Sequence, residues 1–247
     1  MKIVACYSNK GGVGKTASAV NIAYGLAKAG QRVLLCDLDP QGASGFYFRV
    51  KPSKKLTDER FFTDVKRFTS AIRGSDFDNL DILPANMSFR DFDVFLSRMK
   101  NSRSRLKKAL KSVDKDYDVV LLDCPPNIST LSENVFKSAD AILVPVIPTT
   151  LSERTFEQLL AFFDENGMPK KKILGFFSMV QGTKKLHSET VTAMRKHYGK
   201  RLLDVAVPFS SEVEKMGVHR APVGTFARNN AAVKGYDLLC KELLERL

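Results

Sequence analysis

The chain has 247 residues, of which 44% are hydrophobic and 9% aromatic, so it can bury a core and is too apolar for a disordered protein. Its 39 lysines and arginines outnumber 27 aspartates and glutamates, and the formal charge of +12 favours a polyanionic partner such as nucleic acid or an anionic membrane surface. The longest apolar runs fall well below the roughly 18 residues that a membrane span needs, and the first residues lack the pattern of a cleavable leader, so we expect a cytoplasmic protein.

Strand-like runs alternate with helix-like segments along the chain. The runs are residues 2–8, 32–37, 81–83, 119–123, 141–147, 173–180 and 205–208. Several of them are continuously apolar rather than alternating, which is typical of strands covered on both faces. This order predicts an α/β fold, doubly wound, with a mostly parallel sheet between helices. We expect residues 1–247 to form a single domain.

The helical segments are marked by composition and spacing. Residues 15–29 are helical by composition and are followed by Gly30, which suits the left-handed position after a helix. Apolar residues recur at helical spacing within 103–114, so the basic residues of that stretch should face outward. The leucines within 236–247 predict a final helix that docks on the domain. The stretch 46–74 mixes a proline, lysines and helix-like pieces, and is the least predictable.

A glycine-rich septet follows the first strand and opens the first helix. It consists of Lys10, Gly11, Gly12, Val13, Gly14, Lys15 and Thr16. In such a loop the glycines let successive backbone N–H groups point at phosphate oxygens, and the helix N-terminus adds its positive dipole end. Lys15 should contact the β and γ phosphates, and the Thr16 hydroxyl should ligate Mg²⁺. Because Asn9 replaces the first glycine of the ordinary phosphate-loop motif, the septet fits the deviant Walker A form, which is marked by the additional Lys10.

Two further segments place carboxylates at strand ends. Residues 37–42 close the second strand and contain Asp39, while Asp123 ends the strand 119–123. The carboxyl ends of parallel strands are where α/β proteins bind ligands, so Asp123 is suited to hold a metal directly or through water. Either aspartate alone could be a helix cap. Behind the septet, at these separations, both favour a site for a nucleotide and its metal.

The septet, 37–42 and 123–126, in this order and spacing, resemble the ParA/MinD family of deviant-Walker ATPases, most closely its small ParA-type members. Residues 143–146, 174–179 and 207–222 also resemble ParA, so the similarity covers nearly the whole chain. The resemblance implies a P-loop ATPase with ATP and Mg²⁺ as cofactors. It also implies an ATP-sandwich homodimer and slow hydrolysis until a partner completes the site.

The resemblance assigns roles to individual residues. Lys10 of each subunit would reach the phosphates held by the other, and Asp39 would orient the attacking water or act as base. The candidate catalytic residues are therefore Lys10, Lys15 and Asp39, and the candidate metal ligands are Thr16, Asp39 and Asp123.

The nucleotide site would comprise the septet, Ala17 and Asp123, with Met179, Pro208 and Phe209 near the adenine. Two departures from the family pattern make the adenine contacts the least defined. Ala17 stands where the family often has a second threonine, and the loop between Pro208 and Arg220 is longer than in the small chromosomal members.

Surface charge decides what the ATP-bound dimer attaches to. In the ParA family, basic residues of the C-terminal third bind DNA without sequence preference, through phosphates and with steep salt dependence. The candidates here are Lys184, Lys185, Lys215, Arg220 and Arg228. A second stretch, 98–111, holds seven lysines or arginines and no acid, and is interpreted as a solvated helix face.

The implied function is the positioning of an intracellular cargo from the nucleoid. The DNA-bound dimer would be released when a ParB-like or cargo-adaptor protein, offering a basic disordered N-terminal segment, triggers hydrolysis. The same chemistry would serve a plasmid or chromosome locus, a chemoreceptor array or a carboxysome, so the cargo stays open.

Three alternatives keep the fold and change the function. A MinD-like membrane-associated ATPase would end in a basic amphipathic helix, but 236–247 hold two basic and three acidic residues, so no membrane anchor is expected. A metabolic or metal-handling ATPase would hydrolyse ATP in response to a substrate and not to DNA. Electron transfer, as in the nitrogenase iron protein, would need a cysteine to partner Cys124. The four cysteines are instead scattered and read as small buried hydrophobes.

Overall fold

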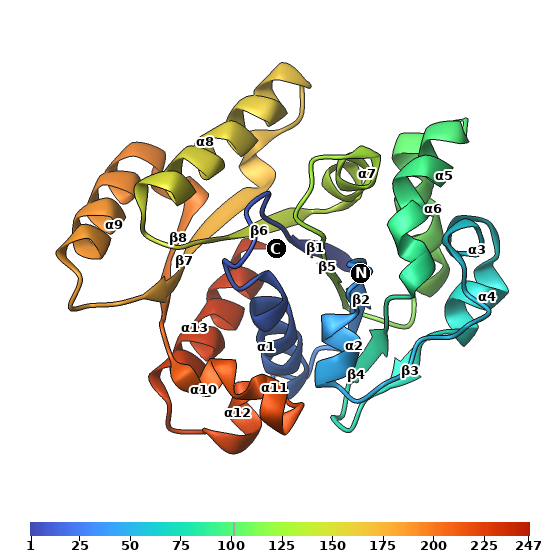
Figure 1. Cartoon of the computed structure of the whole chain (residues 1–247), viewed down its shortest axis with the longest axis horizontal. Coiled ribbons are helices and arrows are strands. Elements are labelled where there is room, and N and C mark those ends of the chain that lie inside the picture. The colour runs from blue at the N-terminus through green and yellow to red at the C-terminus, as the bar shows by residue number, and fades with distance from the viewer. Residues whose placement is uncertain (101) are drawn as a thin grey trace.

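The computed structural model describes residues 1–100 and 102–247, and in them one sheet of eight strands forms the middle layer (Figure 1). The strands are β1 (Lys2–Cys6), β2 (Val33–Asp37), β3 (Arg73–Gly74), β4 (Leu80–Leu83), β5 (Val119–Asp123), β6 (Ala141–Val146), β7 (Ile173–Val180) and β8 (Leu202–Pro208). Their spatial order is β3-β4-β2-β5-β1-β6-β7-β8, and only β3 runs antiparallel to its neighbour. The predicted doubly wound, mostly parallel sheet is confirmed.

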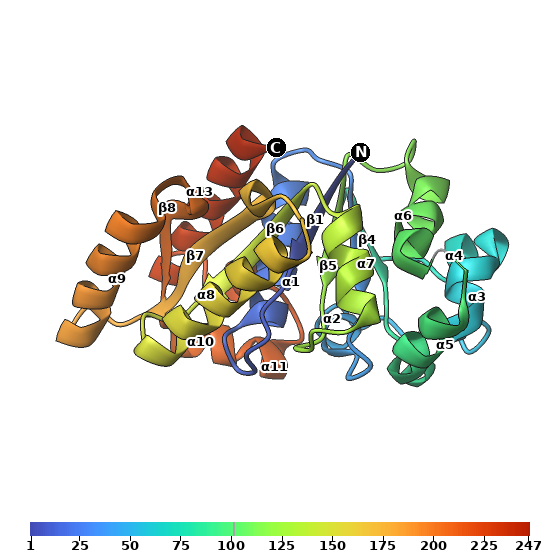
Figure 2. The same cartoon turned by 90° about the horizontal axis from the view of Figure 1, so that it is seen from above.

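Helices cover both faces of this sheet. They are α1 (Lys15–Lys28), α2 (Ala43–Tyr47), α3 (Asp58–Thr63), α4 (Val65–Ser70), α5 (Phe92–Arg98), α6 (Arg105–Leu110), α7 (Thr130–Ser138), α8 (Thr150–Glu165), α9 (Lys185–Tyr198), α10 (Ser211–Glu214), α11 (Met216–His219), α12 (Val223–Phe226) and α13 (Ala231–Arg246). Figure 2 shows α7, α8 and α9 on one face and α1 and α13 on the other. Helices α3 to α6 lie beyond β4, beside α7.

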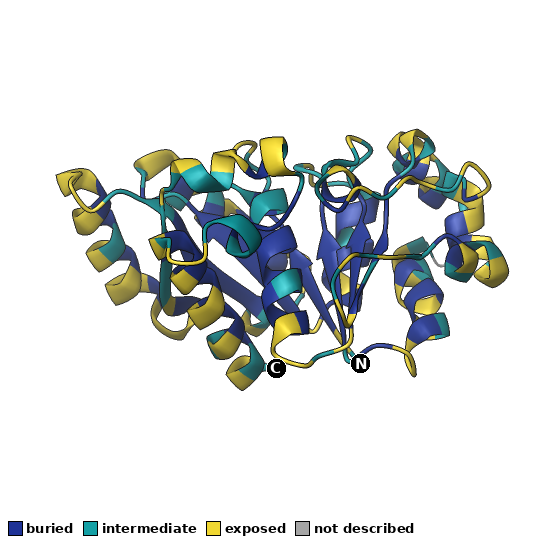
Figure 3. Ribbon diagram, turned by 90° about the horizontal axis from the view of Figure 1, so that it is seen from below, coloured by how far each residue is buried: buried dark blue, intermediate teal, exposed yellow. Residues whose placement is uncertain are grey.

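Alternation along each strand divides the core between the two faces. On β1 and just after it, Ile3, Ala5 and Tyr7 join the cluster on the α7 face, whereas Val4 and Cys6 join the cluster on the α1 face. The strands are dark blue in Figure 3 because both of their faces are covered. The buried position of the sheet explains why its strands read as continuous apolar runs.

Most predicted elements form, with shifted ends. The first strand stops at Cys6 and the last begins at Leu202, three residues before the predicted start. The predicted helix 103–114 is shorter: α6 begins at Arg105, and its last turn continues as a 3-10 turn, η3 (Lys111–Val113). Gly30 has a φ of +89°, as a left-handed residue after a helix should. The two-residue β3 was not predicted, and single-domain organisation stays a prediction.

The final helix docks on the fold, as predicted. Leu239, Cys240 and Leu243 of α13 are buried, and the helix packs against α1 and β8. The Lys2 ammonium donates a hydrogen bond to the carbonyl oxygen of Leu247, so the two termini lie together (Figure 3). They lie at the edge where β1 starts, opposite the edge where the parallel strands end. In the described residues no helix is long and apolar enough to cross a membrane.

Candidate nucleotide site

The glycine-rich septet turns between β1 and α1. Gly12 and Gly14 have φ values of +73° and +85°, a region that side chains with a Cβ rarely adopt. A Cβ on Gly14 would also lie 3.1 Å from the Cε atom of Met179. The loop therefore requires glycine at position 14, both because of the positive φ and because Met179 leaves little room for a Cβ. Met179 thus lies beside the start of α1.

Two lysines of the loop are held by different groups. Lys15 is buried, and its ammonium donates a hydrogen bond to the carbonyl of Lys10 at 3.2 Å. The Lys10 ammonium donates to the Ser152 Oγ atom at 3.0 Å, and the Thr149 hydroxyl donates to the same oxygen at 3.1 Å. Ser152 lies in the first turn of α8 and is itself buried. Both cations are therefore positioned at the mouth of the loop by neutral oxygens.

Two buried carboxylates face the loop from adjacent strands. Asp37 and Asp123 are register partners at the ends of β2 and β5. Asp37 accepts hydrogen bonds from the backbone N–H groups of Asp39 at 3.1 Å and Ser44 at 3.1 Å. The Ser44 hydroxyl donates to Asp123 Oδ2 at 2.9 Å.

Burial shifts the protonation of both carboxylates. It raises the pKa of Asp37 well above its ordinary value, and the neighbouring Asp123 carboxylate raises it further. Burial also raises the pKa of Asp123, to about 6, although hydrogen bonds from Ser44 and Thr16 act in the opposite direction. A cation placed here would favour the charged forms of both carboxyls.

The residues present fit a magnesium ion. The Oδ1 atom of Asp123 is buried and has no hydrogen-bond partner within the described part of the chain. The Thr16 hydroxyl hydrogen-bonds the same carboxylate, so a carboxylate and a hydroxyl lie together at the loop. Groups of three or more His, Cys, Asp or Glu suited to a metal are absent from residues 1–100 and 102–247. Mg²⁺ usually keeps several waters and takes one or two carboxylates plus substrate phosphates, so a single free carboxylate oxygen suffices.

Asp39 is more exposed than the buried pair. It lies two residues beyond the end of β2, and its Oδ1 atom accepts a hydrogen bond from the backbone N–H of Gln41 at 3.0 Å. The backbone N–H of Gly42 donates to the Asp39 carbonyl at 2.9 Å, and Gly42, with a φ of +66°, directly precedes α2. Asp39 therefore lies on a turn at the rim of the site, where a solvent molecule can reach it.

Comparison with known proteins places the chain in a family. A protein-family model described as an AAA domain matches residues 1–174. The chromosome-partitioning ATPase Soj of Treponema pallidum is 28% identical over 251 residues, which cover 99% of this chain and 98% of the relative. The sporulation initiation inhibitor protein Soj of Bacillus subtilis is 27% identical over 248 residues, with 98% of each chain covered. This chain belongs to the ParA/MinD family of ATPases. It is a ParA/Soj-like partitioning ATPase, as the sequence motifs indicated.

Solved structures share the fold of this ParA/MinD chain over its whole length. Cobyrinic acid a,c-diamide synthase from Mycobacterium smegmatis, solved with an ATP analog and magnesium, gives a TM-score of 0.81 at 25% identity and covers 99% of this chain and 95% of its own. McdA from Cyanothece, solved without nucleotide, gives 0.83 at 18% identity, with 98% and 99% covered. These relatives confirm the fold, and the first of them bound nucleotide and magnesium.

The candidate adenine residues lie at the ends of the last two strands. Met179 has a φ of +55°, an uncommon value for a side chain of its size, at the point where β7 passes the loop. Pro208 ends β8, and the backbone N–H of Phe209 donates to the carbonyl of Val180 at 2.9 Å. The fold thus brings Met179, Pro208 and Phe209 to the same side of the sheet edge, with Met179 beside Gly14 of the loop.

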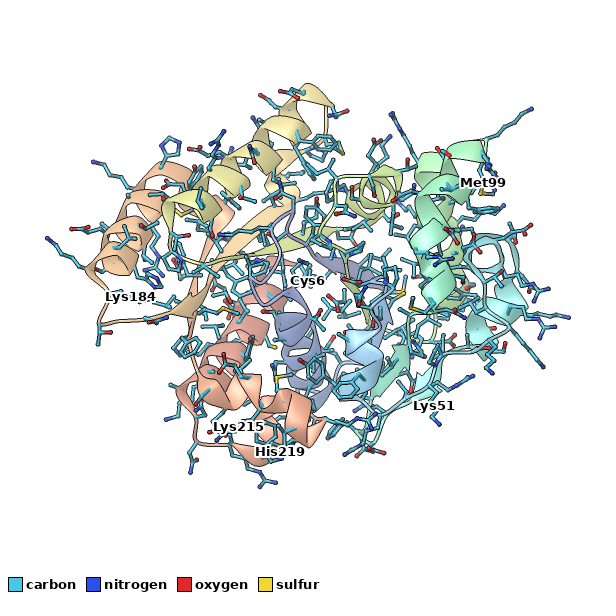
Figure 4. All side chains as sticks on the ribbon, viewed as in Figure 1. Cys6, Lys51, Met99, Lys184, Lys215 and His219 are labelled. Carbon is cyan, nitrogen blue, oxygen red and sulfur yellow. The ribbon has the colours of Figure 1, made fainter. Side chains whose placement is uncertain are left out.

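The five candidate DNA contacts come from two segments. Lys184 and Lys185 lie at the start of α9, whereas Lys215, Arg220 and Arg228 come from the segment that contains α10 to α12. Figure 4 shows Lys184 and Lys215 on the side of the sheet formed by β7 and β8, far from Met99 and Lys51. Lys184 and Arg228 are exposed. Their DNA contacts stay a prediction.

The remaining three already have partners. Lys185 pairs with Glu189 at 3.5 Å and Lys215 with Glu212 at 2.7 Å, and both pairs are exposed enough for solvent to weaken them. Arg220 lies over the ring of Phe46 at 4.7 Å from its centroid and donates from Nε to the Phe46 carbonyl at 3.1 Å. Arg220 thus joins α11 to α2, and only partly faces solvent.

Sequence reasoning missed three polar residues of this site. Asp37 had a signal, because it stands two positions before Asp39 at the end of an apolar strand, but it was left without a role. Ser44 and Ser152 had no signal in the sequence, since each reaches its partner across a long sequence separation. The Lys10–Ser152 contact joins residues 142 positions apart, which only the folded chain reveals.

Proposed function

We propose that this protein is a nucleotide-switched ATPase that dimerises around ATP, binds DNA without sequence preference as a dimer and positions an intracellular cargo. The observation that carries the proposal is the placement of Lys10. Its ammonium lies at the mouth of the phosphate loop on a neutral serine, within reach of solvent, and it forms no ion pair with a carboxylate among the described residues. A cation held in this way is available to phosphates that a second subunit presents.

In this proposal each nucleotide is held mainly by its own subunit. The backbone N–H groups of the loop and the Lys15 ammonium bind the phosphates, and Thr16 and Asp123 hold Mg²⁺. When bound, the ion neutralises charge on the β and γ phosphate oxygens. Asp39 orients the attacking water from the rim. Lys10 of the partner subunit stabilises charge that develops during phosphoryl transfer.

The switch follows from the charge on Lys10. Lys10 attracts a second subunit only while the γ phosphate is present, so hydrolysis loosens the dimer. Hydrolysis by the residues present is slow, and a ParB-like or cargo-adaptor protein accelerates it. The support for a cytoplasmic, nucleoid-associated cycle is the full-length similarity to partitioning proteins and the net charge of +12.

The two competing functions have less support. Leu239 and Leu243 of the last helix are buried, and the helix packs against α1 and β8, which argues against a MinD-like membrane anchor. A metabolic ATPase has one observation in its favour, since the M. smegmatis protein with the same fold is named a cobyrinic acid a,c-diamide synthase. The partitioning relatives match this chain at similar or higher identity over its full length, so we place partitioning first.

Sedimentation velocity with a non-hydrolysable ATP analogue, with ADP and without nucleotide tests the proposal. Wild type should be dimeric only with the analogue. Lys10→Ala should bind the analogue and stay monomeric, whereas Lys15→Gln should not bind it at all. Lys115→Ala removes an exposed lysine away from the loop and should behave as wild type. Normal dimerisation of Lys10→Ala would overturn the role given to Lys10.

A further inference from the structure

A hollow lies between α3, α4 and α6. These helices form the part of the molecule beyond β4 (Figure 1). Its walls include Phe61, Phe62 and Phe68, with Val65 at the rim and Arg105 and Lys108 on the α6 side. The volume is about 210 Å³. An apolar cavity of roughly 150 Å³ accepts benzene, so this hollow has room for one aromatic side chain.

The apolar wall of the hollow is a packed aromatic cluster. The ring of Phe61 lies 5.1 Å from Phe68, 5.4 Å from Phe89 and 5.0 Å from Phe92, centroid to centroid. Phe61 and Phe68 line the hollow although each is only 1% exposed, and Phe89 and Phe92 are buried outside its lining. Edge-to-face contacts at these distances stabilise a fixed arrangement, so the wall exists before any ligand arrives.

The α6 side of the hollow is cationic and not neutralised. The Arg105 Nε–H group is buried without a hydrogen-bond partner among the described residues, although Nη2 of the same side chain donates to the Lys100 carbonyl at 2.8 Å. Lys108 is exposed. Of the seven basic residues in 98–111, only Arg103 has an ion pair in the described chain, with Glu133. An orphaned buried donor costs free energy until an acceptor reaches it.

The one acid that lines the hollow is already engaged. Asp64 accepts a hydrogen bond from the backbone N–H of Arg67 at 3.0 Å and lies 4.0 Å from the Arg67 guanidinium. It caps α4 and does not reach the α6 cations as an ion-pair partner. The positive charge beside the phenylalanine wall is therefore left for a molecule from outside.

We propose that this surface docks an acidic peptide segment of a partner protein, with one aromatic side chain seated in the hollow and flanking carboxylates on Arg105 and Lys108. The two parts of the surface match the two parts of such a segment. The apolar wall contacts the aromatic ring, and the unpaired cations bind the carboxylates. DNA fits less well, because phosphates need no phenylalanine-walled hollow. The surface contains none of the residues assigned to the nucleotide site, so the inference does not rest on the proposed function.

The test uses the nucleotide-free full chain and two synthetic peptides. The first is Glu-Asp-Glu-Phe-Glu-Asp-Glu, and the second has alanine in place of phenylalanine. Backbone amide shifts in ¹H–¹⁵N spectra report where each peptide binds. We expect the phenylalanine peptide to shift amides of α3, α4 and α6. The alanine peptide should bind at least about tenfold more weakly, since a buried ring contributes most of the apolar free energy of binding.

Two charge reversals on one helix separate specific docking from general attraction. Lys108→Glu should weaken binding of the phenylalanine peptide by about fivefold or more, because it places a negative charge, like those of the peptide, at the rim of the hollow. Lys107→Glu makes the same change in net charge at an exposed position that does not line the hollow, and should have less than half that effect. Both lysines are exposed, so the fold should tolerate both variants.

Several results would overturn the inference. These are amide shifts absent from α3, α4 and α6 at millimolar peptide, equal binding of the two peptides, or equal effects of Lys107→Glu and Lys108→Glu. Random-sequence duplex DNA that shifts these amides when the peptide does not would make the surface a nucleic-acid site instead. Failure of the proposed function would show separately, as loss of ATP-dependent dimerisation in wild type.

Discussion

Replacing Asp123 by asparagine should make the nucleotide-free protein more stable, at the expense of its function. Burial raises the pKa of this carboxyl from 3.8 to about 6, so at neutral pH the fold must hold a charge that the unfolded chain holds more easily. The difference between these two pKa values corresponds to about 3 kcal/mol of lost folding stability at pH 8. Asparagine carries no charge and can still accept the hydrogen bond from Ser44.

The sign and pH range follow from linkage. Because the folded pKa lies above the unfolded one, stability from the neutral carboxyl is complete below pH 3.8 and is lost as the pH rises through about 6. The advantage of Asp123→Asn should therefore be about 1.5 kcal/mol at pH 5 and level off near 3 kcal/mol above pH 7. Urea unfolding with EDTA at pH 5, 6, 7 and 8 measures it.

A surface aspartate supplies the control. Asp118 accepts hydrogen bonds from the Arg32 guanidinium, which lower its pKa to about 2. Asp118→Asn should therefore lower the free energy of unfolding at pH 8, opposite in sign to Asp123→Asn. If Asp123→Asn were less stable than wild type at pH 8, or if its advantage did not grow between pH 5 and pH 7, the electrostatic account of the site would be wrong.

Three other substitutions probe separate parts of the site. Asp39→Ala should bind ATP, remain dimeric and stay on DNA in gel-shift assays, and normal hydrolysis would remove its catalytic role. Gly14→Ala puts a Cβ at φ +85°, so thermal melts should show a lower midpoint and calorimetry weaker ATP binding; wild-type values for both would contradict the loop geometry. Arg220→Ala removes a cation–π contact of about 0.5–1 kcal/mol, so amide exchange in α2 should speed up by about two- to fivefold, with α13 as the unchanged reference.

The sequence predicted the sheet and the loop because both depend on local patterns. Continuous apolar runs arise wherever a strand is covered on two faces, and the septet specifies its own turn through glycines at positive φ. The strand ends were less predictable. Leu202 joins β8 because it pairs with Gly175 of β7. The start of this strand therefore depends on a partner from another part of the chain and not on the residues next to Leu202.

Contacts between distant segments were beyond sequence reasoning. Arg220 was predicted as a DNA contact from its charge, yet the fold places its guanidinium over a ring on α2. The stretch 98–111 was interpreted as a solvated helix face, and its lysines do face outward, but α6 also forms one wall of an aromatic hollow. In both places the side chain's partner comes from another part of the chain, and composition does not reveal it.

Binding to random-sequence duplex DNA, measured with ATP, with ADP and without nucleotide across a salt series, tests the central claim most directly. The account predicts tight binding with ATP alone, weakening steeply as salt rises because the contacts are to phosphates. Absence of binding with every nucleotide at low salt would contradict it and move the membrane and metabolic functions ahead.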